Sequence, residues 1–231
     1  MTSTHVLVYQ LGKVGSKAIR GALHAAGVAT FHMHRPELAA EQLRLSREGG
    51  HRIVIITGCR DLMARNISAF FENMSNPKRP EIYVGETDAV LAMTPEALID
   101  AFTTRHREIL ESAFGWFGKF ESVTDVDVFA RPFPHLTGYA ILDGPLPVAI
   151  YRQENLAEAY SRICSAFDLG HCPLQPVNVG AQKPYAALYR GFLERYRPDE
   201  ATLDVIYGSA FMQHFYSPDE IDGFREKWRG A

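Results

Sequence analysis

Short apolar runs alternate with helical patterns through residues 1–76, and this alternation restricts the fold more than any other feature of the chain. The runs are residues 5–10 (HVLVYQ), 28–34 (VATFHMH) and 52–57 (RIVIIT). Strands that are apolar throughout and separated by helices are typical of a parallel sheet covered on both faces. We therefore expect an α/β fold with a central parallel sheet flanked by helices.

Turn residues indicate where the first helices begin and end. One helical pattern covers residues 17–26 and stops at Gly27, and a second follows Pro36 and stops at residues 49–50, both glycine. Proline in the first turn and glycine just beyond the last are favoured there. A third helical pattern covers residues 61–73. The sequence therefore predicts three consecutive strand–helix units.

The rest of the chain is predicted to add one strand and several helices. Residues 77–145 are interrupted by prolines, and we expect one helix there, at 95–112. Later elements are a strand at 146–151 and helices at 155–167, 185–196, 199–212 and 217–228. We find no repeat or linker that would divide the chain. We expect one domain: β-α units in 1–76, a mostly helical insertion in 77–145, and the last strand with a helical tail in 146–231.

Composition argues against several classes of protein. The chain has 231 residues, with 24 Lys and Arg against 27 Asp and Glu. These values disfavour disorder and a strongly basic nucleic-acid binder, so we expect no nucleic-acid partner. Three cysteines without a Cys-x-x-Cys pair favour a reduced compartment. No apolar stretch approaches the about 18 residues of a membrane span. We therefore expect a soluble cytoplasmic protein.

The charge is unevenly distributed along the chain. Residues 1–71 contain nine Lys and Arg and four Asp and Glu, a net charge of +5, which leaves −8 for the other residues. Five of the nine histidines also lie in this first part. A basic segment of this kind suits an anionic ligand, although solvated basic helix faces would give the same count.

Polar residues gather at the predicted carboxyl ends of the strands. Open parallel sheets bind ligands beyond these ends, where the loops diverge. The residues concerned are Lys13, Ser16, His32, His34, Arg60, Arg152 and Glu154. With a lysine, a pair of histidines and two arginines, these strand ends predict an anion-binding pocket.

The loop after the first strand, residues 12–17 (GKVGSK), is the most specific part of this pocket. Its glycines allow a tight turn, the following helix contributes the positive end of its dipole, and Lys13 adds a full charge. This arrangement can hold a phosphate or sulfate, but a glycine turn with a lysine is equally often structural. The loop lacks the Gly-Lys-Ser/Thr of a Walker A motif and does not match Gly-x-Gly-x-x-Gly.

The third strand–helix unit offers a second candidate contact. Arg60 follows the buried strand, and Ser68 comes eight residues later, about two helical turns on. An arginine in the loop and a hydroxyl on the helix can converge on one phosphate. Alternatively, Arg60 pairs with Asp61 or with a C-terminal carboxylate, and Ser68 bonds to a helix carbonyl.

Two segments resemble the cofactor motifs of sulfotransferases. Residues 9–16 (YQLGKVGS) are similar to the 5′-phosphosulfate loop of that family, in which Lys-x-Gly-Ser/Thr follows the first strand. Residues 59–70 (CRDLMARNISAF) are similar to its 3′-phosphate motif. The resemblance is closest to the bacterial capsular-polysaccharide-synthesis and sulfotransferase-like group. Lys17 is a departure, since many members carry a hydroxyl residue there.

The resemblance implies a P-loop-like three-layer fold and 3′-phosphoadenosine 5′-phosphosulfate as sulfuryl donor. It implies a hydroxyl acceptor, a carbohydrate or small metabolite, and no metal. In this interpretation Lys13 stabilises the charge on the leaving phosphate. The implied cofactor-binding residues are Gly12, Lys13, Val14, Gly15, Ser16, Lys17, Arg60 and Ser68.

The acceptor hydroxyl needs a base, and the end of the second strand offers two histidines. His32 and His34 lie two positions apart and so share one strand face. A neutral imidazole accepts a proton near pH 7. We favour His34, with His32 next and Glu154 as the carboxylate alternative.

Two other functions stay open at this level. One is a P-loop-type phosphotransferase, which the missing Gly-Lys-Ser/Thr disfavours. The other is a catalytically silent nucleotide-binding protein, since Lys17 departs from the pattern and the base is unassigned. The sequence leaves the identity of the acceptor and the oligomeric state open.

Overall fold

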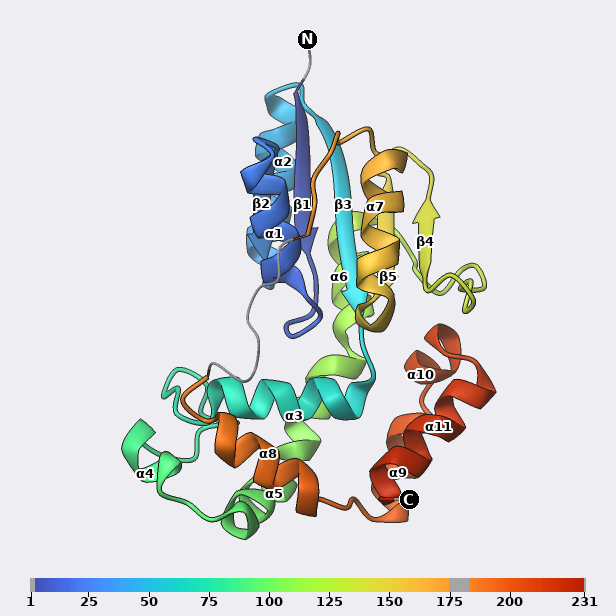
Figure 1. The fold of residues 1–231 in the computed structure, drawn as a ribbon. Coiled ribbons are helices and arrows are strands. Elements are labelled where there is room, and N and C mark those ends of the chain that lie inside the picture. The colour runs from blue at the N-terminus through green and yellow to red at the C-terminus, as the bar shows by residue number, and fades with distance from the viewer. Residues whose placement is uncertain (1–2, 175–182, 231) are drawn as a thin grey trace. The chain divides into compact units, whose positions relative to one another are not determined.

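The computed structural model describes residues 3–174 and 183–230. They belong to two compact units (Figure 1). The sheet unit lies within Met1–Arg60 and Gly115–Val177, and the helical unit within Asp61–Phe114 and Asn178–Ala231. Each unit is described by itself. The expected single domain, with its divisions after residues 76 and 145, stays a prediction.

Five strands form the central sheet of the sheet unit. They are β1 (Thr4–Tyr9), β2 (Ala29–Met33), β3 (Arg52–Cys59), β4 (Tyr139–Leu142) and β5 (Val148–Arg152). The order is β2-β1-β3-β5-β4, and every neighbouring pair is parallel except β4 and β5. The predicted α/β fold with a central parallel sheet is confirmed.

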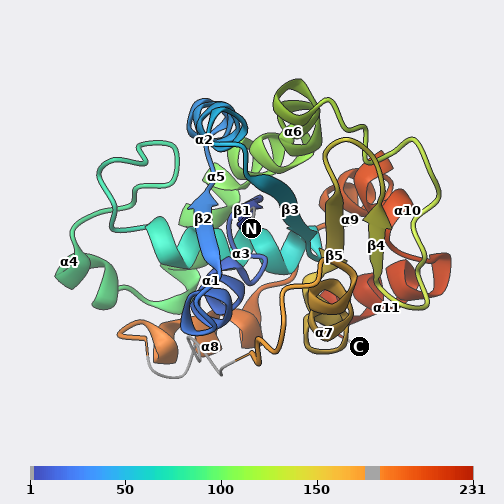
Figure 2. The same ribbon diagram turned by 90° about the horizontal axis from the view of Figure 1, so that it is seen from above.

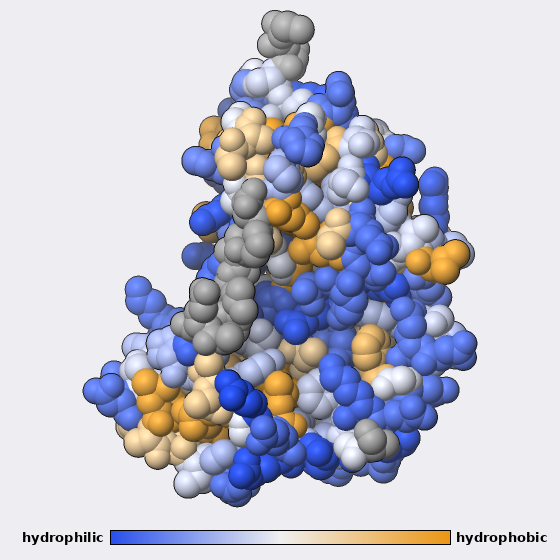
Figure 3. Space-filling model, in the orientation of Figure 1, coloured by the Kyte–Doolittle hydropathy of each residue, from blue (hydrophilic) through white to orange (hydrophobic). Residues whose placement is uncertain are grey.

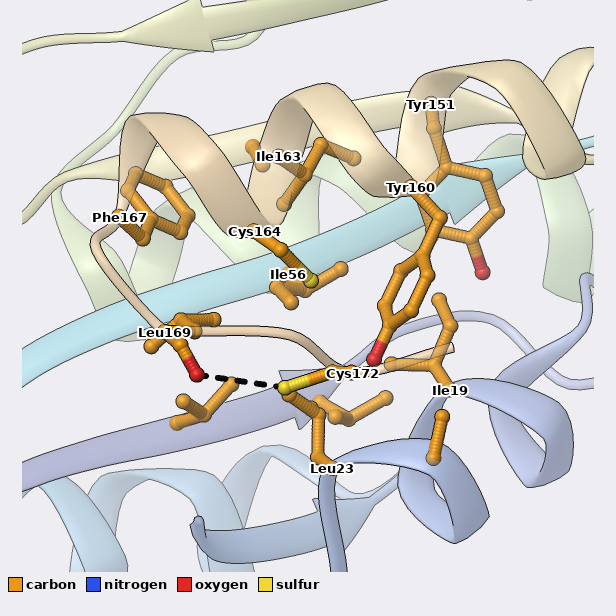
Figure 4. Close-up of a cluster of buried hydrophobic side chains, with 14 of the residues drawn as sticks. Ile19, Leu23, Ile56, Tyr151, Tyr160, Ile163, Cys164, Phe167, Leu169 and Cys172 are labelled. Atoms are coloured by element: carbon orange, nitrogen blue, oxygen red, sulfur yellow. Dashed lines mark hydrogen bonds between the residues drawn. The ribbon is translucent and has the colours of Figure 1, made fainter. Parts of the chain in front are cut away.

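Helices cover both faces of this sheet. They are α1 (Ser16–Ala25), α2 (Pro36–Glu48), α6 (Trp116–Thr124) and α7 (Leu156–Ala166), with a short 3₁₀ turn, η1 (Gln153–Asn155), before α7. Helices α1 and α7 lie on one face, and α2 and α6 on the other (Figure 2). On the first face, Ile19 and Leu23 of α1 and Tyr160 and Ile163 of α7 pack in one buried cluster with Ile56 of β3 (Figure 4).

Two elements of the sheet unit were not expected. Strand β4 has only four residues, YAIL, all half-buried, and an apolar run this short does not distinguish a strand from a loop. Helix α6 follows α5 after Gly115, where we expected no helix. Its aromatic residues are buried: Tyr9 of β1 stacks on Phe120 at 5.5 Å and meets Trp116 edge-on at 5.0 Å.

The described part of the helical unit contains helices joined by loops. They are α3 (Leu62–Asn73), α4 (Thr87–Leu91), α5 (Pro95–Phe114), α8 (Ala186–Arg195), α9 (Glu200–Tyr207), α10 (Ala210–Phe215) and α11 (Pro218–Arg229). The expected helix at 199–212 is wrong as one element. It breaks at Gly208, and Ser209 then caps α10 by accepting a hydrogen bond from the Met212 N–H at 3.3 Å.

A buried carboxylate connects three helices of the helical unit. Asp61 caps α3 by accepting hydrogen bonds from the backbone N–H groups of Met63 and Ala64. It also accepts from the Tyr207 hydroxyl of α9 at 2.9 Å and the Trp228 indole of α11 at 3.2 Å. An aspartate that would otherwise be an unpaired buried charge therefore fixes both C-terminal helices to the start of α3.

The surface is mostly hydrophilic, as the average composition of the chain predicts. Hydrophilic residues cover most of the face seen in Figure 3, with smaller apolar groups between them. Within residues 3–174 and 183–230, no helix combines the length and apolar character needed to cross a membrane.

His106 of α5 is a buried polar residue without a clear structural role. Neither ring nitrogen has a hydrogen-bond partner among the described residues, and the ring lies 5.0 Å from that of Phe102. Burial lowers the pKa of His106 from 6.5 to about 4, against a smaller opposing effect of Asp199. The folded protein therefore keeps this imidazole neutral at pH 7.

We expect His106→Leu to raise the free energy of unfolding by about 1–3 kcal/mol, because it removes a buried polar group that has no partner. The folded pKa lies below the unfolded one, so the stability of the native protein is complete above about pH 6.5. It then falls toward pH 4 by up to about 1.4 kcal/mol per pH unit. Urea unfolding at pH 7.5 and pH 5 measures both effects. The exposed His171→Leu is the control, and an unchanged pH dependence in His106→Leu would contradict this account.

Candidate functional site

The loop between β1 and α1 has an unusual backbone. Lys13 has φ +75° and Gly15 has φ +96°, both in the left-handed region, and α1 begins at Ser16. The backbone N–H groups of Ala18 and Ile19 donate to the Gly15 carbonyl. The loop follows β1, which lies between β2 and β3, at the point where successive connections run to opposite sides. Such a switch point is where open α/β sheets bind ligands.

The conformation of Lys13 is costly for a residue with a side chain. A non-glycine residue in the left-handed region is strained by about 1–3 kcal/mol. The surrounding contacts must therefore fix this conformation. Residues of this kind cluster at ligand sites, and here the strained residue is also the lysine that the sequence analysis selected.

Tyr151 of β5 fixes the loop. Its hydroxyl lies 2.7 Å from the Val14 carbonyl oxygen and 2.9 Å from Gln10 Oε1. The side chain is fully buried, and this burial raises the pKa of Tyr151 well above its usual value of 10. The hydroxyl therefore stays protonated and donates to the loop at any ordinary pH.

Two glycines make room for this contact. A Cβ on Gly58 of β3 would lie 2.5 Å from Cζ of the Tyr151 ring, so only glycine allows the ring to approach. A Cβ on Gly15 would lie 2.7 Å from Cδ2 of Leu156, in a backbone conformation that already favours glycine. Sequence analysis missed Tyr151 because it reads as an ordinary member of an apolar strand.

Arg60 adds a second cation beside the loop. It follows β3, is half-buried, and donates from a guanidinium nitrogen to the Lys13 carbonyl oxygen at 3.3 Å. Among the described residues, Arg60 forms no ion pair, and the alternative pairing with Asp61 is not seen because Asp61 bonds to α3, Tyr207 and Trp228. The charge of Arg60 therefore lacks a carboxylate partner in the part of the chain that is described.

His34 is placed next to the same loop. Its Nδ1 lies 2.6 Å from the Gln10 carbonyl oxygen, which can only accept, so Nδ1 carries the proton and donates. In neutral His34 the lone pair then lies on Nε2. The tautomer is thus set by a backbone group at the end of β1, and His34 itself is exposed.

His32 differs from His34 in its surroundings. Its ring contacts that of His34 edge-on, with centroids 4.5 Å apart. Burial, and then the nearby charges of His34, Arg20 and Lys17, lower the pKa of His32 to about 4. Its Nε2 is buried without a hydrogen-bond partner among the described residues. His32 is therefore neutral and half-buried, whereas His34 is exposed.

The other predicted site residues are placed as follows. Ser16 is buried in the first turn of α1, and Lys17 is exposed in the same turn. Ser68 belongs to the helical unit, on the half-buried face of α3, and its hydroxyl makes no hydrogen bond among the described residues. Its expected role with Arg60 stays a prediction. Glu154 is exposed in η1, and its role as a base is untested.

The described residues hold no group of three or more His, Cys, Asp or Glu side chains placed to bind a metal ion. Comparison of the chain with family models, with curated proteins and with solved structures gives no match. The functional argument therefore depends on the residues and geometry of the loop itself.

The two loop glycines give a matched test of this geometry. We expect Gly15→Ala to lower the free energy of unfolding by about 1–3 kcal/mol, because alanine is strained at positive φ and its Cβ would meet Leu156. Gly12→Ala should change it by less than about 0.5 kcal/mol, since its Cβ would have nothing within 4 Å. Urea unfolding of both variants measures the difference. Equal effects would show that the left-handed turn does not depend on Gly15.

Proposed function

We propose that the chain is a sulfotransferase that moves a sulfuryl group from 3′-phosphoadenosine 5′-phosphosulfate to a hydroxyl acceptor, a carbohydrate or small metabolite. The observation that carries the proposal is the Arg60–Lys13 contact. It places two cations from neighbouring strand ends on one strained turn at the start of a helix. This combination supports a site for the whole donor more strongly than the loop sequence alone, with Lys13 at the 5′-phosphosulfate and, as the resemblance implies, Arg60 at the 3′-phosphate.

The residues of the loop fit such a donor. The left-handed backbone at Lys13 and Gly15 and the N-terminus of α1 offer N–H groups and a positive dipole end to an anion. Arg60 supplies a charge with no carboxylate partner among the described residues. The bound donor supplies the activated sulfuryl group, and the P-loop-like turn holds its 5′-phosphosulfate. Lys13 then stabilises the negative charge that develops on the leaving 5′-phosphate.

His34 is the proposed base. The Gln10 carbonyl holds the proton of neutral His34 on Nδ1, so Nε2 accepts the proton of the acceptor hydroxyl. The hydroxyl oxygen forms the new bond to sulfur while the bond between sulfur and the 5′-phosphate oxygen breaks. His32 is a poorer base because its Nε2 is buried and its pKa is about 4.

Binding of the desulfated nucleotide tests the donor site. We expect 3′-phosphoadenosine 5′-phosphate to raise the melting temperature more than ATP with Mg²⁺ does, since a ligand of the native state stabilises it. Arg60→Ala should weaken binding about 10- to 100-fold, the loss of one or two charge-assisted hydrogen bonds. The exposed Arg162→Ala is the control. Stabilisation by ATP with Mg²⁺ alone would favour a phosphotransferase and contradict the proposal.

Turnover with a library of hydroxyl compounds tests the base. We expect His34→Ala to lower kcat about 100-fold or more, which is typical for loss of a general base, and to leave nucleotide affinity unchanged. His32→Ala should retain turnover within about tenfold of the parent. Release of 3′-phosphoadenosine 5′-phosphate is the readout. Full turnover in His34→Ala would move the base elsewhere, and nucleotide binding without turnover in the unaltered chain would favour a silent binder.

A further inference from the structure

Strand β2 leaves one edge of the sheet open, because it pairs with β1 on one side and with no described strand on the other. The Met33 carbonyl accepts a hydrogen bond from the Gln10 N–H, so the backbone groups of Met33 and, two positions earlier, of Phe31 point toward β1. The N–H and C=O groups of Thr30 and His32 therefore point away from the sheet. These are the groups to which an added strand would bond.

This edge forms the floor of an open groove between two helices. Helix α1 lies on one face of the sheet and α2 on the other, with β2 between them (Figure 2). The groove has a volume of about 740 Å³, and the residues that line it include Arg20 and His24 of α1, Thr30–Met33 of β2, and Leu38, Glu41 and Gln42 of α2. An extended chain that adds to β2 would therefore lie between two walls of different chemistry.

The α1 wall of the groove is basic. Arg20 and His24 are exposed and lie four positions apart, on one face of a helix that has no acidic residue. Neither side chain forms a hydrogen bond or an ion pair with the described residues. After burial and His34, the charge of Arg20 contributes to the low pKa of His32, so His32 and, by alternation, Thr30 face this wall. Carboxylates on a partner would complement it.

The α2 wall is mainly apolar. The ring of Phe31 lies 5.0 Å from that of His5, which hydrogen-bonds to a serine of α2 at 2.9 Å, so Phe31 is on the α2 face of the sheet. Leu38 is 52% exposed and lines the groove on the same side. Glu41 also lines this wall, and it pairs with Arg44 of the same helix at 2.8 Å. Apolar side chains on a partner would cover Leu38 and Phe31.

We propose that the β2 edge binds an extended segment of a partner protein in which acidic and apolar residues alternate. The segment adds to β2 as an antiparallel strand, the more stable ladder per residue, and bonds to the backbone of Thr30 and His32. Residues opposite these two direct carboxylates toward Arg20 and His24, and the residues between them direct apolar side chains toward α2. Over the five residues of β2, the pattern is apolar-acidic-apolar-acidic-apolar. This binding is separate from the proposed sulfuryl transfer.

Other occupants would use only part of the groove. A second copy paired through the same edge would bring Arg20 and His24 against the same two residues, and like charges would meet. A small anion or a nucleic acid would meet the basic wall but would offer the β2 backbone no strand to pair with and Leu38 no apolar side chain. An alternating strand complements the backbone and both walls together.

A palindromic peptide, acetyl-Val-Glu-Val-Glu-Val-amide, tests the strand pairing by titration calorimetry with the full chain, since it has the same pattern in either direction. We expect one site per chain with a dissociation constant below about 1 mM. Methylation of both glutamate nitrogens, which face β2 in an antiparallel ladder, should weaken binding about tenfold or more. Methylation of the central valine nitrogen, which faces solvent, should weaken it by less than about threefold. Equal effects of the two methylations, or no binding at about 1 mM, would overturn the proposal.

Charge reversal tests the basic wall. Arg20→Glu with His24→Glu should weaken binding of the glutamate peptide about tenfold or more, and the double variant should instead bind the same peptide with lysine in place of glutamate. Both positions are exposed, so the variant should keep its melting temperature. Arg162→Glu, exposed on α7, is the control and should bind as the unaltered chain does.

Two results would overturn the charge complementarity and the choice of occupant. One is equal affinity of the unaltered chain for the glutamate and lysine peptides. The other is sedimentation showing a dimer of the chain that the glutamate peptide dissociates, because the edge would then belong to a second copy.

Discussion

The candidate site depends on one buried hydroxyl. Tyr151 extends from β5 past β3, and its hydroxyl donates to the Val14 carbonyl at 2.7 Å and lies 2.9 Å from the Gln10 side chain. A buried carbonyl without a partner costs about 1–3 kcal/mol, so this contact offsets part of the strain at Lys13. Three strands thus act together to hold one turn, and Gly58 is glycine because the Tyr151 ring occupies the space of a side chain.

The same loop organises the charged groups around it. Gln10 bonds through its side chain to Tyr151 and through its carbonyl to His34, so the end of β1 connects β5 with the end of β2. Arg60 bonds to the carbonyl of Lys13 from the end of β3. A rigid backbone therefore positions the cations and the imidazole, which is what preorganised stabilisation of developing charge requires.

Much of the fold was predictable because its signals are local. The runs that became β1, β2 and β3 are mostly apolar, and glycine or proline marks the ends of α1 and α2. Strand β4 was missed because a short, half-buried edge strand has little pattern. The break between α9 and α10 was missed because Gly208 can also occur within a helix, and only the cap at Ser209 marks the boundary.

The site was predictable in its residues but not in its connections. Lys13, Arg60 and His34 are polar residues directly after apolar strands, a pattern that is visible in one sequence. The contacts that fix them join residues far apart in the chain, such as Tyr151 with Val14, and periodicity carries no information on such pairs.

Edge strand β2 depends on both local and long-range information. Its composition is visible in the sequence, but its position at the edge of the sheet follows from the strand order. A strand at an edge leaves one row of backbone N–H and C=O groups that bond to water or to another strand, and composition alone does not show which strand that is.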